Sequence, residues 1–351
     1  MALVMLAMPR LLVAQDDLPQ GHHPLPEEGD IVGQIKTVTA TQGDTLIDLG
    51  LSHGLGYNAV TEANPETRIW LPGEGTQVLL PTRFILPPGP REGIVINLAE
   101  LRLYYYRPAS PGAPPRVETY PIGIGRMDWK TPLGTTKITA KLENPTWYPP
   151  ASIIAEHAER GEELDRVVPP GPDNPLGEYA MILDIPGYLI HGTNKPDGVG
   201  MRVSHGCIRM LSGDIEDLIY RVPKGTEVRL INQPVKFGWT PRGLLEMQAY
   251  PVPEESPEKM ASRIADAFDT ATQEANARGL LVDYARLKAE LQGPTGVARS
   301  LLLASAPITV KRTFYDRLTL HHALYSQLAA TVDATEKDAA ANVNGVPVEE
   351  R

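Results

Sequence analysis

Short runs of β-branched and aromatic residues, separated by connections rich in proline and glycine, fill the middle of this chain of 351 residues. Two of them, Ile94–Leu98 and Leu101–Tyr106, lie on either side of a tight turn. Similar runs recur at 117–124, 135–140, 179–185 and 228–231. Such residues favour extended backbone, and many short strands with turn residues between them are typical of a sandwich or barrel. The sequence therefore predicts a mostly β fold, a β-sandwich or barrel, for this region.

Two other segments of this region depart from the strand pattern. Residues 214–221 place Ile215, Leu218 and Ile219 on one face at helical spacing, which predicts an amphipathic helix packed on the sheet. Residues 149–170 carry several charges between flanking prolines. We interpret them either as a lid over a cleft or as a solvated insertion.

The N-terminus begins with an apolar stretch about as long as the core of a signal peptide and too short to span a bilayer. No Lys or Arg precedes the stretch, and Pro9-Arg10 interrupts it. We interpret residues 1–14 as a signal peptide, with a short hydrophobic or disordered N-terminus as the alternative. Residues 15–34 are rich in Pro, Gly, His and acidic residues and are expected to form a flexible linker.

Residues 35–83 predict a small α+β module. Short strands are expected at 37–40 and 76–81, with two short helices between them, the first capped at Thr45. This strand–helix–helix–strand order is similar to that of LysM modules, which bind the N-acetylglucosamine-containing glycan of peptidoglycan. The resemblance rests on Gly43-Asp44-Thr45-Leu46, Glu62-Ala63-Asn64-Pro65 and Val78-Leu79-Leu80-Pro81. A small spacer domain is the alternative.

The C-terminal part carries weaker signals. Residues 234–255 suggest a small β extension, and residues 256–351 an Ala-rich helical segment followed by a loosely ordered tail. The net charge of −10 argues against a nucleic-acid partner, for which a basic face would be expected. Beyond the N-terminal stretch, no segment is predicted to span a membrane.

Cys207 is the single cysteine, so no internal disulfide can form. It stands sixteen residues after His191, in a segment that also contains His205 and Arg209. A thiol with an ordinary pKa of about 8.5 needs a base or a positive neighbour to become a nucleophile at neutral pH. Nucleophilic catalysis is therefore the leading hypothesis. A buried structural thiol is one alternative, and zinc binding by His191, His205 and Cys207 is another, although no paired Cys-x-x-Cys or His-x-x-x-His supports zinc.

The surrounding residues resemble the active-site signature of the L,D-transpeptidases of the YkuD family. The signature is carried by His191-Gly192-Thr193-Asn194, by Gly198-Val199-Gly200 and by Ser204-His205-Gly206-Cys207-Ile208-Arg209-Met210. Further matching segments occur in the family's order at 94–98, 101–105, 120–126, 131–136, 144–150 and 174–177. The resemblance spans residues 91–233, for which it implies a YkuD-like catalytic domain.

The resemblance implies specific roles. Cys207 attacks the meso-diaminopimelate–D-Ala bond of a tetrapeptide stem and forms an acyl-enzyme, with His191 as its base. Gly192 orients that imidazole through its carbonyl, while the backbone around Ser204, His205 and Gly206 supports the oxyanion. Arg209 supports the loop or binds a substrate carboxylate. The resemblance implies no cofactor and no metal.

Several acceptors of the acyl group remain open. They are the amine of a second diaminopimelate, which gives 3–3 cross-links, the terminal lysine of a Braun-type outer-membrane lipoprotein, and water, which would make the protein an L,D-carboxypeptidase or hydrolase. A non-catalytic wall-binding protein that depends on the LysM-like module is the alternative from another class. For all of these the expected partner is peptidoglycan, and the expected location is the periplasm of a Gram-negative-type cell.

Overall fold

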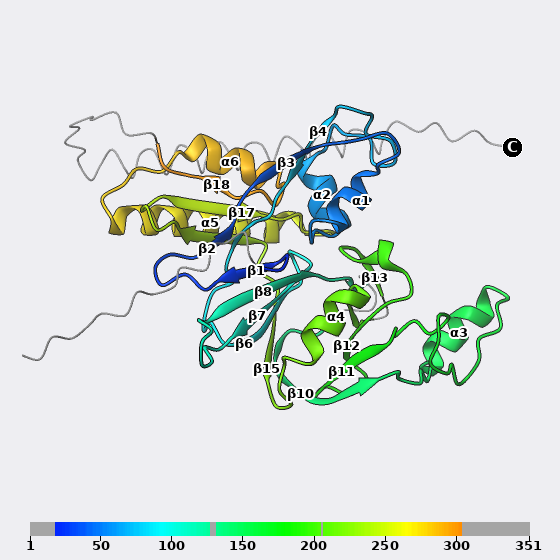
Figure 1. Cartoon of the computed structure of the whole chain (residues 1–351). Helices are drawn as coiled ribbons and strands as arrows, with labels where there is room; N and C mark the ends of the chain where they lie inside the picture. The colour runs from blue at the N-terminus through cyan, green and yellow to red at the C-terminus, as the bar shows by residue number, and fades with distance from the viewer. Residues whose placement is uncertain (1–17, 127–130, 205, 304–351) are drawn as a thin grey trace, which may run out of the picture. The chain divides into compact units, whose positions relative to one another are not determined.

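The computed structural model describes residues 18–126, 131–204 and 206–303 (Figure 1). The proposed signal peptide, His205 and the end of the expected tail lie outside these residues. The chain divides into two compact units. The first comprises the residues up to Pro253 together with Thr270–Leu302, and the second comprises Glu254–Asp269 and the residues from Leu303 on.

A nine-stranded sheet forms the centre of the first unit. In order across the sheet its strands are β1 (His22–Pro24), β8 (Arg116–Pro121), β7 (Arg102–Arg107), β6 (Gly93–Asn97), β15 (Glu227–Ile231), β10 (Gly134–Glu143), β11 (Tyr179–Leu183), β12 (Leu189–His191) and β14 (Ile208–Arg209). Most neighbours are antiparallel, but β15 pairs with β6 and β12 with β14 in parallel. The mostly β prediction is confirmed, and the strands lie close to the predicted runs.

Strands β6, β7 and β8 are buried on both faces. Alternate residues of a strand point to opposite faces, so Ile94 and Leu103 belong to one core and Val95 and Tyr104 to the other. The first core lies between the sheet and helix α4 (Ser212–Ile219), where Ile215, Leu218 and Ile219 are buried as predicted. The sheet therefore has two layers packed against it.

The second core joins the sheet to the module. Its members include Leu46, Val60 and Leu80 from the module and Val117 from β8. The module contains β3 (Lys36–Thr39), α1 (Leu46–Leu51), α2 (Tyr57–Ala63) and β4 (Gln77–Leu80). This is the predicted strand–helix–helix–strand order, with β3 antiparallel to β4 and the Thr45 hydroxyl accepting from the Asp48 N–H at the start of α1.

Residues 15–34 differ from the expected flexible linker. Strand β1 pairs with β8 at the edge of the large sheet, and β2 (Ile31–Gly33) pairs with β5 (Arg83–Ile85). His22 is buried there, with its Nε2 3.3 Å from an Asp217 carboxylate oxygen. The sheet edge offers unpaired backbone groups, so a segment without a strand pattern of its own is held as a strand.

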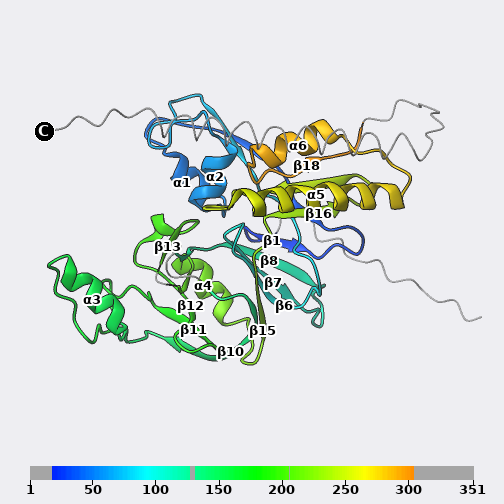
Figure 2. The same cartoon turned by 180° about the vertical axis from the view of Figure 1, so that it is seen from behind.

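Residues 149–170, predicted as a lid or a solvated insertion, contain a helix that the sequence did not predict, α3 (Ala151–Glu159). Trp147 and Val168 form a β-bridge that closes the base of this excursion. Figures 1 and 2 show α3 beyond β11 and β12, away from the module helices. Two short strands, β9 (Ile124–Gly125) and β13 (Arg202–Ser204), pair in parallel, and a 3₁₀ turn covers Pro196–Gly198.

The C-terminal extension forms a three-stranded sheet of β16 (Val235–Trp239), β17 (Leu245–Ala249) and β18 (Arg299–Ser300). The first two strands were predicted, whereas β18 comes from the region expected to be loosely ordered. The predicted helical segment contains α5 (Pro257–Ala277), which runs across the boundary between the two units, and α6 (Tyr284–Gln292). Within the second unit, Glu255 and Arg263 form an ion pair of 2.8 Å.

A buried polar cluster fastens the extension to the sheet. The Lys236 ammonium donates to a Glu100 carboxylate oxygen at 2.8 Å and to the carbonyl of Ile85. Glu100 also accepts from the hydroxyls of Tyr104 and Tyr250. Lys236 is 2% exposed and Glu100 7%, so each charge depends on the other for compensation.

Replacing Lys236 by Met should destabilise the protein by about 3–5 kcal/mol, because it leaves the Glu100 carboxylate buried without its counter-charge. Lys137→Met is the matched control. Lys137 pairs with Asp184 at 3.5 Å where both side chains are more than half exposed, and such pairs are worth about 0–1 kcal/mol. Denaturant unfolding measures both. Equal denaturation midpoints for the two variants would contradict a stabilising role of the buried Lys236–Glu100 pair.

Candidate active site

The parallel pairing of β12 with β14 brings the two halves of the sequence motif together. Ile190 lies opposite Ile208 and His191 opposite Arg209, while Cys207 immediately precedes β14. Ile190 and Ile208 are fully buried in the first core. The residues on either side of them alternate to the other face of the sheet. His191 and Cys207 therefore belong to one face of two adjacent strands.

The Cys207 thiol is partly exposed and lies beside Gly187, in the connection between β11 and β12. Its Sγ is 3.7 Å from the carbonyl oxygen of Gly187. Loss of hydration raises the pKa of the Cys207 thiol above its ordinary value, while a hydrogen bond from the Leu189 backbone and the charge of Arg209 act in the opposite direction. At neutral pH the resting thiol is therefore protonated.

The His191 imidazole is 3% exposed. Its Nδ1 lies 2.6 Å from the carbonyl oxygen of Gly192, and since a carbonyl only accepts, Nδ1 donates. The neutral ring then carries its lone pair at Nε2. Burial, with a smaller contribution from Arg209, lowers the pKa of His191 to about 4, against the opposing effect of the Gly192 and Leu176 backbone. The imidazole is thus neutral and able to accept a proton at neutral pH.

The loop that carries Cys207 is held by two hydroxyl groups. Ser204, 1% exposed, donates through Oγ to the Cys207 carbonyl at 2.6 Å. The Thr131 hydroxyl donates to the Gly206 carbonyl at 2.9 Å. Gly206 has φ +103°, a conformation in which a side chain would be strained. Among the predicted support residues, Ser204 and Gly206 therefore shape the turn that presents the thiol.

Gly192 and Arg209, two further predicted residues, lie on or next to β12 and β14. A Cβ on Gly192 would meet the Leu176 carbonyl at 3.3 Å, so glycine fits the close approach of the strand to that loop. The guanidinium of Arg209 is partly buried, and its Nε has no hydrogen-bond partner among the described residues. His205 lies outside the residues that the structure describes.

Two residues that support the site received no role from the sequence. Thr131 binds Gly206, as described above, and Asn174 is fully buried beside the loop under His191. Asn174 donates to the Pro145 carbonyl at 2.8 Å and accepts from the Leu176 N–H at 2.9 Å. Both residues fall within segments that carry the family resemblance, which is the signal that could have marked them.

The zinc alternative included His205, which lies outside the described residues. Across residues 18–126, 131–204 and 206–303, no three His, Cys, Asp or Glu side chains gather as metal ligands would. The same residues include no helix with the length and hydropathy of a membrane-spanning segment.

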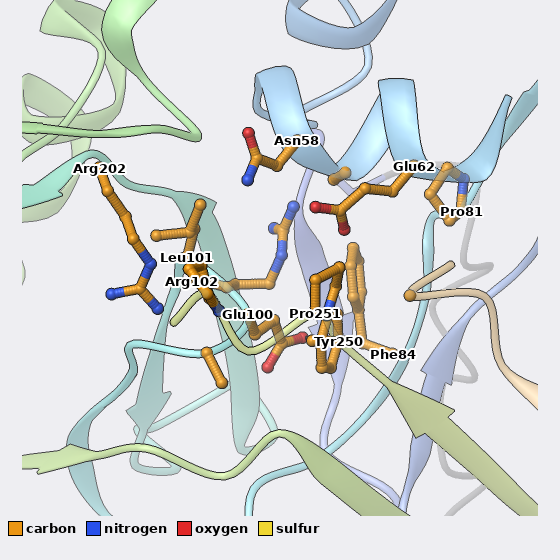
Figure 3. A pocket seen from close by; sticks show the side chains of 14 residues that line it. Asn58, Glu62, Pro81, Phe84, Glu100, Leu101, Arg102, Arg202, Tyr250 and Pro251 are labelled. Atoms are coloured by element: carbon orange, nitrogen blue, oxygen red, sulfur yellow. The ribbon is translucent and has the colours of Figure 1, made fainter. Parts of the chain in front are cut away.

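A separate pocket lies between the module, the sheet and the extension (Figure 3). Asn58 and Glu62 of α2 face it from one side, Arg202 of β13 from another, and Tyr250 after β17 from a third. Burial raises the pKa of Glu62 to about 7, which the charge of Arg202 partly opposes. Neither Cys207 nor His191 lines this pocket.

The chain is similar to known proteins of one family. Residues 91–230 match the sequence profile of the YkuD family, described as the L,D-transpeptidase catalytic domain. The chain is 41% identical to the probable L,D-transpeptidase ErfK/SrfK of Escherichia coli K12, over 78% of this chain and 89% of that one. It is 44% identical to the probable L,D-transpeptidase YbiS of the same organism, over 63% and 72%.

A more distant relative and a solved structure also match. The putative L,D-transpeptidase YkuD of Bacillus subtilis is 28% identical over 55% of this chain and 98% of its own. The crystal structure of L,D-transpeptidase 3 from Mycobacterium tuberculosis covers 44% of this chain and 66% of its own, with 19% identity and a TM-score of 0.29. On the identity and coverage of the Escherichia coli relatives, this chain belongs to the YkuD family of L,D-transpeptidases.

Proposed function

We propose that this protein acts on peptidoglycan through a cysteine acyl-enzyme, with Cys207 as nucleophile and His191 as base. The observation that carries the proposal is the β12–β14 pairing, which places a buried imidazole at the end of one strand and the motif thiol immediately before the strand beside it. The Gly192 carbonyl fixes the tautomer that leaves Nε2 free to accept a proton. Nucleophilic acyl transfer needs a base of this kind next to the nucleophile.

The proposed reaction has two halves. The Cys207 sulfur attacks the carbonyl carbon of the meso-diaminopimelate–D-Ala bond while His191 takes the thiol proton. A C–S bond forms, the C–N bond breaks, and His191 passes the proton to the departing D-alanine amine. An acceptor amine then attacks the thioester, gives up a proton to His191, and releases the thiol, which recovers that proton.

The remaining predicted residues have supporting roles in this proposal. Ser204 and Gly206 hold the turn from which backbone N–H groups would stabilise the oxyanion, and His205 is assigned to the same turn by resemblance. Gly192 orients the base. Arg209, opposite His191 in the strand register, is assigned to support of the loop or to binding of a substrate carboxylate by its guanidinium.

We place the protein in the periplasm, with the module at 35–83 as a LysM-like glycan anchor, the catalytic region at 91–233, the β extension at 234–255 and the tail at 256–351. The βααβ order of the module supports the glycan-binding role. Among the acceptors, we favour the terminal lysine of a Braun-type lipoprotein. The order of module, catalytic region and extension is similar to that of family members that carry out this attachment.

Cys207→Ala should abolish release of D-alanine from a tetrapeptide stem, because it removes the thiol that is proposed to form the acyl-enzyme. The measurement is D-alanine release together with intact-protein mass spectrometry, which should find the acyl group on wild-type protein alone. Ser212→Ala is a suitable control, since Ser212 donates to the Thr193 carbonyl nearby without touching the thiol. Turnover by Cys207→Ala would refute the mechanism.

The pH dependence of kcat tests His191. Only the neutral ring can accept the thiol proton, and a pKa lowered to about 4 keeps the folded ring neutral well below the ordinary value of 6.5. At saturating peptide, kcat should therefore hold as pH falls from 7 to 5 and decline about tenfold per unit below about 4. Circular dichroism at each pH must show folded protein. A decline of kcat centred near pH 6.5 would contradict the role of the buried His191 as the base.

The acceptor is tested by offering competing amines to one acyl-enzyme. Selectivity must come from groups that place an amine near the thioester and exclude water. With tetrapeptide sacculi and a peptide that ends in lysine, we expect the peptide–muropeptide conjugate to exceed 3–3 dimers and free tripeptide. The same peptide with an acetylated lysine side chain is the control. Dominant dimers would assign cross-linking, and dominant tripeptide would assign hydrolysis.

A further inference from the structure

Helix α2 of the module makes backbone contact with the segment that leads to Cys207. The Tyr57 N–H donates to the Val199 carbonyl at 3.1 Å, and the Asn58 N–H donates to the Gly200 carbonyl at 3.2 Å. These donors belong to the first turn of α2, whose N–H groups have no partner within the helix. The first turn of the module's second helix is thus satisfied by the catalytic region.

Two glycines make this contact possible. A Cβ on Gly56 would lie 2.4 Å from the Gly200 Cα, and a Cβ on Gly200 would lie 2.2 Å from the Tyr57 nitrogen. Gly200 also has φ +86°, which disfavours any side chain. No real Cβ atom approaches a backbone so closely. The two backbone segments are therefore in direct contact, with no space for a side chain between them.

The contacted segment continues directly into the catalytic turn. On its other side the Gly200 N–H donates to the Ile122 carbonyl at 3.1 Å, and β13 pairs with β9. Strand β13 ends at Ser204, whose hydroxyl holds the Cys207 carbonyl. The start of this segment, at Val199 and Gly200, therefore contacts α2, while Gly200 and β13 are bound on the other side by Ile122 and β9.

Side chains beside this contact line a pocket. The pocket in Figure 3 opens beside it, between Asn58 and Glu62 of α2 and Arg202 of β13. Apolar side chains such as Phe84 and Leu101 line the rest of this pocket, and beside it the two backbone hydrogen bonds join α2 to the residues that precede β13.

We propose that α2 positions the nucleophile, with Gly56, Tyr57 and Gly200 as positioning residues for Cys207. The inference rests on the proposed role of Cys207 and goes beyond glycan anchoring. The module contributes to acyl transfer even on a substrate without sugar, because its first helical turn fixes one side of the segment that ends at the thiol. A displacement of about 1 Å at a reacting group can cost a factor on the order of 100 in rate.

Tyr57→Pro tests the proposal, with Tyr57→Ala as its matched control. Tyr57 is the first residue of α2, a position that tolerates proline, and Gly56 before it is extended, as a residue preceding proline prefers. Proline removes the N–H that binds Val199 and puts a ring carbon in its place. Alanine removes the same side chain and keeps the hydrogen bond.

Both full-length variants are assayed for D-alanine release from a soluble tetrapeptide without sugar, and for thermal unfolding. We expect kcat of Tyr57→Pro to be about tenfold or more below that of Tyr57→Ala, with KM within about twofold. Equal kcat values, or a loss in KM alone, would overturn the proposal. A wild-type protein that releases no D-alanine would instead refute the proposed function.

A second pair of variants decides the matter if Tyr57→Pro does not fold. Gly200→Ala and Gly75→Ala introduce a side chain at nearly the same backbone angle, φ +86° and +84°, but a Cβ on Gly75 meets nothing within 4 Å. The backbone strain is therefore similar in the two variants, and only the variant at Gly200 places a Cβ against α2. We expect kcat to fall in Gly200→Ala alone. Equal kcat in the two variants would overturn the positioning role.

Discussion

Strands β6, β7 and β8 have no solvent-facing side, and this double burial organises the first unit. Their consecutive apolar residues, such as Ile94 and Val95 or Leu103 and Tyr104, point alternately into two cores. One core is shielded from water by α4 and the strands of the catalytic site. The other core is shielded by the module. With a single cysteine and therefore no disulfide, burial of these side chains is the main source of stability.

The same arrangement explains why charges lie inside the protein. Where the module, sheet and extension meet, backbone carbonyls and carboxylates lose their hydration and must find partners there. Lys236 with Glu100 is one solution, and Arg83 with Glu246, joined by two hydrogen bonds of 2.8 Å, is another. Each pair connects segments distant in sequence. The extension is thereby fastened to the sheet and the module by buried or partly buried ion pairs.

The sequence predicted those features that a local pattern determines. Apolar runs marked the strands, the spacing of Ile215 and Leu218 marked α4, and the motif around Cys207 marked the site. Strand β1 was missed because His22 and its neighbours form a strand only where a sheet edge accepts them. Helix α3 was missed because charges and flanking prolines suggested a lid or a solvated insertion without indicating a helix. The contact of Gly56 with Gly200 depends on tertiary structure, which no local pattern reports.

The parallel pairing of β15 with β6 has a consequence for how the chain acquires its structure. Ile94 and Val228 are neighbours in the sheet, although almost the whole catalytic region separates them in sequence. Closing so long a loop costs entropy before any packing compensates for it, and folds dominated by such contacts form slowly. The hairpin of β6 and β7 can form early, but the sheet cannot close around β15 until synthesis has passed residue 231. Assembly of the active site is therefore a late and cooperative event in folding.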